Sequence, residues 1–141
     1  MILLDTDHLS VLTDARQALR TQLMDRLQAS GDEVAIPIPT VEEQLRAWLA
    51  QIHRVGDAHR QIAPYQRLVK LIDFLGDWTI VEWDEPAADA FRHLRVGRVR
   101  IGTQDLKIAA LAIMHDALLL SANLRDFEQV PGLNVEDWLY G

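Results

Sequence analysis

The sequence predicts an α/β protein with a mainly parallel central sheet and helices on both faces. Short apolar runs alternate with longer segments of helical periodicity along the whole chain, which is the pattern of strand–helix–strand units. The first run, residues 1–4, is continuously apolar, as expected of a strand that is buried on both faces. No repeat, low-complexity tract or linker divides the chain, so one domain is expected.

Each element follows from its local pattern. The helical segments carry apolar residues three or four apart on one face, and segment 104–115 is apolar nearly all round, so it is expected to be buried. Pro37 indicates an edge position or an early end for the second strand. The expected strands are 1–4, 34–38, 79–83, 117–121 and 134–136; the expected helices are 15–29, 41 to about 56, 64–75, from 86 onward and 104–115.

Composition narrows the class of protein. At 141 residues, one domain can bury about 68–70% of its unfolded surface. The net charge of −7 argues against nucleic-acid binding by bulk electrostatics, but not against a protein whose metal ions meet the phosphates. Cysteine is absent, so thiolate metal sites are excluded. No apolar run is long enough to span a membrane, Asp5 and Asp7 interrupt a signal-peptide pattern, and a cytoplasmic location is expected.

Four acidic residues lie at turns where an expected strand is followed by an expected helix: Asp5, Glu43, Asp105 and Asp126. In an open parallel sheet such turns meet at the carboxyl ends of the strands. Carboxylates gathered there would repel one another by roughly 4 kcal/mol per pair at about 4 Å, for an effective dielectric constant of about 20. Oxygen ligands select hard divalent cations. The spacing therefore predicts a Mg²⁺ or Mn²⁺ site.

Each acid also has a local structural explanation. Asp5 could cap a short helix through Leu9 and Leu12. Asp105 lies two residues past Thr103, the expected N-cap, so it could simply complement a helix dipole. Asp126 could be an ordinary turn residue. The apolar strand before Asp5 and the buried character of the helix that begins near Asp105 favour a functional site over these alternatives.

Glu43 has the strongest structural alternative. The segment Thr40-Val41-Glu42-Glu43 matches a capping box, in which the glutamate returns to the backbone N–H of the threonine. At about 100° per residue Glu43 points away from the apolar face of its helix, whereas Glu42 lies nearer the edge of that face. Glu43 is preferred as the ligand, and Glu42 stays open as a competitor.

A group of basic residues precedes and enters the Asp105 helix: Arg92, Arg95, Arg98, Arg100 and Lys107. Such a run is often a solvated helix face, but its proximity to the acidic site makes Arg98, Arg100 and Lys107 candidate phosphate contacts. The histidines, His8 included, are interpreted as solvated or capping residues. Trp78 and Trp83 are expected to pack in the core or at its edge.

Two other acidic α/β classes share part of this pattern. The Asp5-Thr6-Asp7 start resembles that of haloacid-dehalogenase-type phosphatases, and a receiver-type signalling switch also has an acidic Mg²⁺ pocket. Both classes need a lysine late in the chain. The only lysines are Lys70 and Lys107, which both precede the candidate late strand. The residue order therefore disfavours both classes.

The sequence resembles the PIN-domain nucleases, and within them the VapC-type toxins of toxin–antitoxin pairs. The resemblance rests on Leu3–Asp7, on Thr40–Glu43 and on the stretch from Ile101 to Trp138, in which Gly102–Ala110 and Ser121–Phe127 are the most specific. It departs from the family pattern at Asp7, where relatives usually have Asn. The Glu43 helix also lacks the usual residues that follow the glutamate, because Gln44 and Trp48 stand there.

The resemblance implies a PIN-like three-layer sandwich over residues 1–141 and Mg²⁺- or Mn²⁺-dependent hydrolysis of RNA by one or two ions. Asp5 and Asp105 would be the main ligands, with Glu43 and Asp126 binding a second ion or water. Thr6, Asp7, Ser121 and Asn123 would be accessory residues. It further implies a small antitoxin partner and a homodimer. An RNA-processing nuclease outside such a pair and a non-catalytic RNA- or partner-binding module are the alternatives.

Overall fold

The computed structural model describes residues 1–140, which contain one five-stranded, all-parallel sheet. The strands are β1 (Ile2–Leu4), β2 (Val34–Pro37), β3 (Thr79–Val81), β4 (Leu118–Leu120) and β5 (Asn134–Glu136). Their order is β3-β2-β1-β4-β5. From β1, the strands β2 and β3 are added on one side of the sheet, and β4 and β5 are then added on the other side. The junction of β1 and β4 is thus a topological switch point, where open α/β sheets place their sites.

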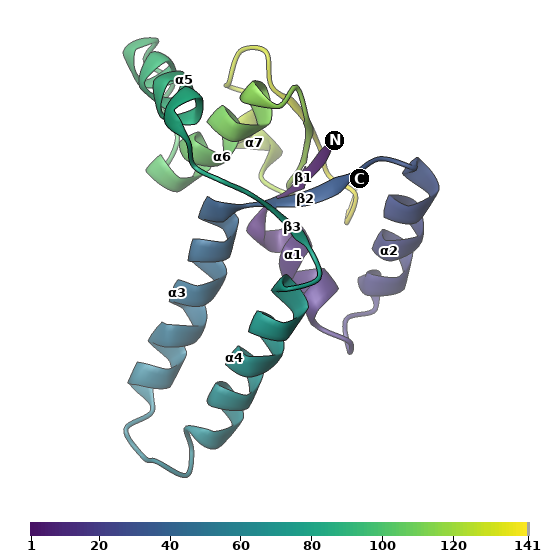
Figure 1. Cartoon of the computed structure of the whole chain (residues 1–141), viewed down its shortest axis with the longest axis vertical. Helices are drawn as coiled ribbons and strands as arrows, with labels where there is room; N and C mark the ends of the chain where they lie inside the picture. The colour runs from purple at the N-terminus through teal and green to yellow at the C-terminus, as the bar shows by residue number, and fades with distance from the viewer. Residues whose placement is uncertain (141) are drawn as a thin grey trace.

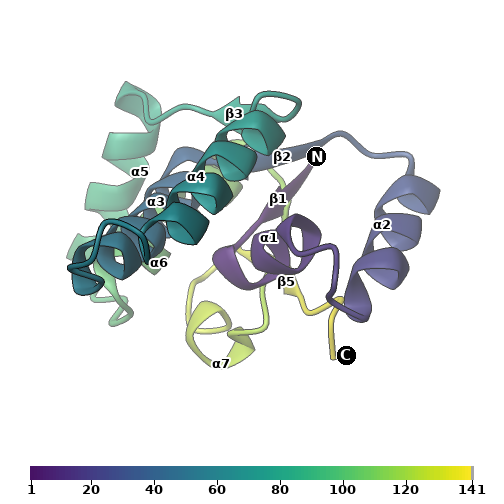
Figure 2. The same cartoon turned by 90° about the horizontal axis from the view of Figure 1, so that it is seen from below.

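Helices cover both faces of the sheet, which confirms the three-layer α/β prediction (Figures 1 and 2). One core cluster joins the sheet to α1 through α4, and the other joins it to α5, α6 and α7. Figure 1 shows α3 and α4 side by side as a hairpin that extends away from the sheet. The helices are α1 (Thr6–Thr13), α2 (Leu19–Ser30), α3 (Ile38–Arg54), α4 (Ile62–Leu75), α5 (Glu85–Val96), α6 (Thr103–Met114) and α7 (Leu124–Phe127).

The central strand is buried on both faces, as its apolar run predicted. Leu3 points into the cluster with α5 to α7, whereas Ile2 and Leu4 point into the cluster with α1 to α4. Strand alternation produces this division. Asp5, the residue after Leu4, is therefore held where both cores and the sheet edge meet.

Helix α6 is buried along most of its length, which confirms the prediction from its all-round apolar pattern. Ile108, Ala109, Ala110 and Leu111 are fully inaccessible. Small alanine side chains let α6 pack closely against both the sheet and α5, with which it shares one core cluster. A helix held this tightly fixes the position of its first turn, which carries Asp105.

Two expected helix starts were wrong, and the structure decides between the two alternatives for Pro37. Helix α2 begins at Leu19 and not at residue 15, because the Arg16 N–H donates to Asp14 Oδ1 in a turn. Strand β2 lies between β1 and β3, so the edge alternative fails, although Pro37 does end the strand early. Helix α3 begins at Ile38, three residues before the expected start.

Within residues 1–140, no helix is both long and apolar enough to cross a membrane.

Phe127 is among the largest fully buried side chains, and it joins α7 to the core beside α6. We expect Phe127→Ala to lower the free energy of unfolding by about 3–5 kcal/mol, because it removes a buried aromatic and leaves a cavity. Urea unfolding measures this. The control Tyr140→Ala alters a side chain that is 77% exposed and should stay within about 0.5 kcal/mol of wild type; equal losses would contradict this account of the core.

Candidate active site

The four predicted acids reach the carboxyl edge of the sheet from different elements. Asp5 is the N-cap of α1, directly after β1. Glu43 lies in α3, which follows β2, and Asp126 lies in α7, which follows β4. Asp105 is in the first turn of α6. The segment before α6 is the end of α5 and a loop, not a strand, so that part of the expectation was wrong. α6 leads into the parallel strand β4 and so begins at the carboxyl edge.

Asp5 is both a helix cap and a member of the acidic cluster, the group formed by Asp5, Glu43, Asp105 and Asp126 at this edge of the sheet. Its Oδ1 accepts a hydrogen bond from the Thr6 N–H at 2.7 Å, and its Oδ2 accepts one from Ser121 Oγ at 2.7 Å. Burial raises the pKa of the Asp5 carboxyl to about 6. The hydrogen bond from Ser121 opposes this shift, and the charges of Asp7 and Asp105 add to it. The capping and functional interpretations of Asp5 are therefore compatible.

Glu43 and Glu42 make different contacts. The Thr6 hydroxyl donates to Glu43 Oε2, which ties α3 to the first turn of α1. Glu42 instead is exposed, pairs with Arg46 at 2.7 Å and accepts a hydrogen bond from Gln104 Nε2 at 2.6 Å. Of the two glutamates, Glu43 is the one that reaches the accessory residue Thr6.

The capping-box interpretation of Glu43 was wrong. Thr40 lies inside α3, and Pro37 occupies the N-cap position without a side-chain cap. The buried Thr40 hydroxyl donates to the Leu4 carbonyl oxygen at 2.9 Å. It therefore joins α3 to the end of β1, beside Asp5. With no cap to make, Glu43 loses its local structural explanation.

Asn123 joins the remaining pair of acids. Its Nδ2 donates to Asp126 Oδ2 at 3.0 Å and to Asp105 Oδ2 at 3.3 Å, and its backbone N–H donates to Ser121 Oγ at 3.0 Å. Burial raises the pKa of the Asp105 carboxyl, and the charges of Glu43 and Asp126 raise it further. These couplings place Asp105 within electrostatic reach of acids from α3 and α7.

Asp7 is the most connected of the accessory residues. Its Oδ2 accepts the Ala122 N–H at 2.9 Å and lies 3.4 Å from Ser121 Oγ. Its Oδ1 lies 2.6 Å from Nδ1 of His8. Ser121 thus stands between Asp5 and Asp7, and all four predicted accessory residues contact the acidic cluster or each other.

The expectation that His8 is solvated or caps a helix was wrong, because the residue is fully buried. The Trp138 N–H donates to His8 Nε2 at 3.1 Å, and Asp137 Oδ1 lies 3.8 Å from the same nitrogen. Since Nε2 accepts, the ring proton is on Nδ1 and is donated to Asp7. A sequence signal was available: His8 and the buried Leu12 are four residues apart and share one face of α1.

The cluster has the chemistry of a cation site but not a closed coordination sphere. Among residues 1–140, no three His, Asp or Glu side chains already converge as a ready metal-binding group. The acids are instead connected through Thr6, Ser121 and Asn123. The donors are all oxygen atoms, and burial and mutual repulsion raise the pKa values of Asp5 and Asp105. A hard cation would offset both effects.

The basic run divides into two parts. Arg95, Arg98 and Arg100 line a cavity of about 310 Å³ beside the start of α6. Lys107 lies outside this lining, with its Nζ 5.9 Å from the centre of the Trp83 ring. Trp83 and Trp78 pack against the two core clusters, as expected.

An all-parallel sheet with carboxylates gathered at its switch point defines an α/β protein with an acidic centre. The chain belongs to the PIN domain family, whose sequence profile matches residues 2–133.

Similar proteins and structures agree with this family. The chain is 31% identical over 85 residues to the tRNA(fMet)-specific endonuclease VapC of Salmonella typhimurium, covering 57% of this chain and 64% of that protein. It is 32% identical over 87 residues to ribonuclease VapC2 of Haemophilus influenzae, covering 58% and 65%. The chain thus spans just under two thirds of these relatives.

Two solved structures share the fold. VapBC2 of Rickettsia felis, bound to a DNA fragment from its promoter, superposes with a TM-score of 0.75 at 23% identity, covering 98% of this chain and 99% of that one. DNA-bound VapBC of Salmonella typhimurium gives a TM-score of 0.76 at 21% identity, covering 97% of each chain. At these identities the superpositions establish the fold.

The buried His8 contacts predict a stability effect. We expect His8→Ala to lower the free energy of unfolding by about 1–3 kcal/mol, because the Trp138 N–H and Asp7 are both left without this partner. Urea unfolding compares it with His53→Ala, which alters an exposed histidine of α3. A destabilisation no larger than that of the control would show that the ring does not anchor the C-terminal segment.

Proposed function

We propose that the chain is a metal-dependent endoribonuclease, which hydrolyses phosphodiester bonds of RNA, and that it is the toxin of a toxin–antitoxin pair. The observation that carries the proposal is the hydrogen-bonded acidic cluster at the switch point, with raised pKa values at Asp5 and Asp105. Membership of the PIN domain family and similarity to proteins named ribonuclease VapC support it. A cytoplasmic location stays the expectation.

The donor set fits Mg²⁺ or Mn²⁺. Asp5 and Asp105 are proposed as the main ligands, and Glu43 and Asp126 as ligands of a second ion or as water-binding groups. When bound, such an ion supplies activation of water and charge neutralisation at the phosphate. The gathered carboxylates repel one another and are partly desolvated, so a cation is the partner that makes their full ionisation favourable.

The accessory residues are proposed to position the carboxylates. Ser121 donates to Asp5, Thr6 donates to Glu43, and Asn123 donates to both Asp105 and Asp126. In each of the four carboxylates, one oxygen accepts a hydrogen bond from one of these side chains. The second oxygen is left to a cation or to water, except at Asp5, where it accepts the Thr6 N–H of the helix cap. Such outer contacts orient ligands before a cation arrives. Asp7, held by Ala122 and His8, adds negative charge beside Asp5.

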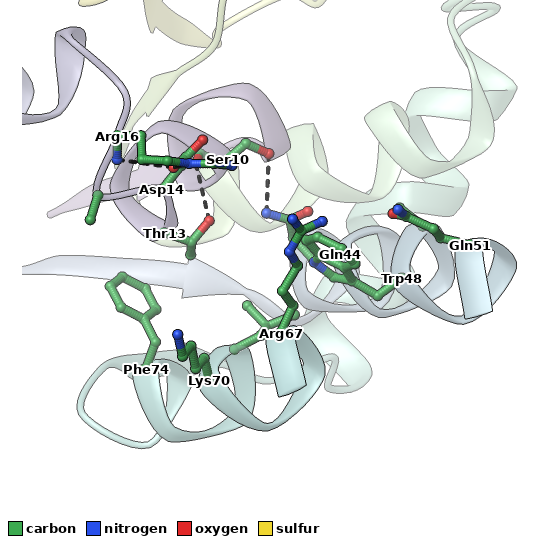
Figure 3. Close-up of a pocket in the computed structure, with 13 residues that line it drawn as sticks. Ser10, Thr13, Asp14, Arg16, Gln44, Trp48, Gln51, Arg67, Lys70 and Phe74 are labelled. Carbon is green, nitrogen blue, oxygen red and sulfur yellow. Dashed lines mark hydrogen bonds and ion pairs between the residues drawn. The ribbon is translucent and has the colours of Figure 1, made fainter. Parts of the chain in front are cut away.

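An antitoxin is the proposed regulatory partner. A cavity of about 640 Å³ lies between α1, α3 and α4, and Figure 3 shows Arg67, Lys70 and Phe74 extending into it from α4. Trp48 and Leu71 add apolar lining, so the cavity suits a segment with apolar and acidic side chains. Gln44, next to Glu43 in sequence, reaches Ser10 across this region at 3.1 Å. A segment seated there would lie near the acidic cluster. The homodimer stays a prediction.

Two alternatives share the fold. An RNA-processing nuclease outside a toxin–antitoxin pair would cut RNA in the same way but would not arrest growth when expressed. A non-catalytic RNA- or partner-binding module would bind without cutting. The retained carboxylates favour catalysis over the second alternative, since a binding module has no need to keep mutually repelling acids together.

Cleavage of RNA tests the proposal directly. The purified chain is expected to cut RNA with Mg²⁺ or Mn²⁺ and not with EDTA, and Asp5→Asn and Asp105→Asn should each lower the rate by at least about 100-fold, since even outer-shell changes at metal sites cost about 10–100-fold. Total tRNA is a suitable first substrate, because one relative is named for a tRNA. The control Asp25→Asn changes an exposed acid of α2 and should keep full activity. Cleavage that survives both site variants would point to a contaminant and overturn the proposal.

Metal binding is tested by stability. The folded pKa of Asp105 is raised above its unfolded value, so its ionisation destabilises the fold as pH rises through the folded pKa, and at pH 7.5 this cost is present. In EDTA at that pH, Asp105→Asn is expected to unfold at the same temperature as wild type or higher.

Addition of Mn²⁺ should reverse this order. An ion at about 100 times its Kd stabilises wild type by about 2.7 kcal/mol, whereas Asp105→Asn should gain much less and Asp25→Asn should respond like wild type. Thermal unfolding with a titration of MnCl₂ measures these shifts. An equal shift in wild type and Asp105→Asn would place the ion elsewhere.

A further inference from the structure

Three arginines gather where α5 ends and α6 begins. Arg95 is in the last turn of α5, and Arg98 and Arg100 lie in the loop that follows. The backbone turns sharply after α5, with Arg98 in the left-handed region at φ 62° and its N–H donating to the Arg95 carbonyl oxygen at 3.1 Å. The turn brings the three side chains to one cavity of about 310 Å³, with Thr103 and Leu106 in its wall.

These guanidinium groups have no acidic partner in the described chain. No carboxylate of residues 1–140 lies within 4.0 Å of any of them, although the protein contains 21 acidic residues and carries a net charge of −7. The Arg95 guanidinium instead lies 5.6 Å from the centre of the Phe91 ring. All three side chains are exposed, and an anion bound in the cavity would be attracted by their like charges. The planar guanidinium matches the oxygen atoms of a phosphate.

The cavity and the acidic centre share one helical turn. Thr103 and Leu106 line the cavity. Asp105, which lies between them in sequence, is not part of the lining and accepts a hydrogen bond from Asn123. Along α6 these residues span only about 4.5 Å, at about 1.5 Å per residue. A chain that crosses the first turn of α6 can therefore touch the acidic centre and the arginines together.

We propose that Arg95, Arg98 and Arg100 form a binding site for a backbone phosphate of the RNA strand, next to the phosphate that is cut. The inference rests on the proposed function, because it takes RNA as the substrate. It replaces Lys107 with Arg95 in the expected set of phosphate contacts, since Lys107 lies outside the cavity.

RNA fits this cavity better than an acidic protein segment does. The cavity is lined by α5, α6 and the loop between them, whereas the cavity of about 640 Å³ is lined by α1, α3 and α4. These two sets of helices cover opposite faces of the sheet (Figure 1). The arginines lie beside the first turn of α6, which also carries Asp105, so an RNA strand bound at the acidic centre would pass close to them. In an anionic protein such a local positive site is also what a polyanion needs for approach.

The site is tested by measuring the affinity of the protein for RNA in EDTA, where no cleavage is expected. Arg98→Ala/Arg100→Ala is compared with Arg54→Ala/Arg60→Ala, which removes the same charge from exposed positions at the tip of the α3–α4 hairpin. The probes are total tRNA and a 20-nucleotide single-stranded RNA.

At about 0.1 M salt we expect the Kd of the Arg98→Ala/Arg100→Ala variant for RNA to rise about tenfold. For the single strand, the slope of log K against log salt should fall in magnitude by about 0.7, because the one phosphate at this site is no longer neutralised. The control should show neither change.

A conservative variant separates charge from geometry. Arg98→Lys/Arg100→Lys keeps both charges, so it should restore the salt slope but only part of the affinity, because lysine lacks the planar fork. Equal RNA affinity of wild type and the alanine variant overturns the proposal, as does an equal weakening in the control. Unchanged RNA affinity with weaker binding of poly-L-glutamate would assign the cavity to an acidic protein segment instead.

Failure of the arginine site and failure of the proposed nuclease function give different results. Wild type that binds RNA through these arginines but never cuts it would refute the nuclease and leave this site standing. Wild type that cuts RNA with Mn²⁺ and shows no dependence on the arginines would refute this site alone. No RNA binding by wild type at any salt concentration would refute both.

Discussion

Hydrogen bonds to a group of mutually repelling carboxylates connect the elements around the carboxyl edge of the sheet. Two charges about 4 Å apart cost roughly 4 kcal/mol at an effective dielectric constant of about 20. Burial raises the pKa of the Asp5 carboxyl to about 6, and the charges of Asp7 and Asp105 add to this shift. A fold that gathers five acids in this way needs neighbours that hold each of them. Ser121, Thr6, Asn123 and the buried His8 provide those contacts.

The parallel topology explains why the acids meet. The order β3-β2-β1-β4-β5 puts the switch point between β1 and β4, so the segments that follow these strands leave in different directions and leave space between them. The same topology puts the cavity lined by α1, α3 and α4 and the cavity lined by the arginines with different helical layers. A partner and a substrate could therefore approach one acidic centre from different sides.

Much of the fold and part of the candidate site could be predicted from local sequence. The apolar run of β1, the all-round apolar pattern of α6 and the acids beside them were sufficient for the fold class and for the placement of Asp5 and Asp105. Local rules failed where a local partner competed with a distant one. Thr40 has the sequence of a helix cap, yet its hydroxyl bonds Leu4, 36 positions earlier. His8 has the sequence of a surface residue, yet it bonds Trp138.

Local sequence was enough to specify the strands, the buried helix and the set of acids, because apolar periodicity depends only on neighbours within a few residues. Long-range packing was needed to select Glu43 over Glu42 as the partner of Thr6, to join Asp105 to Asp126 through Asn123, and to put Arg95 rather than Lys107 in one cavity with Arg98. Separation along the chain accounts for this difference. The Thr6–Glu43 and Ser121–Asp5 bonds span 37 and 116 positions, and a hydrogen bond needs atoms about 3 Å apart, which only the packed sheet and its helices can bring about.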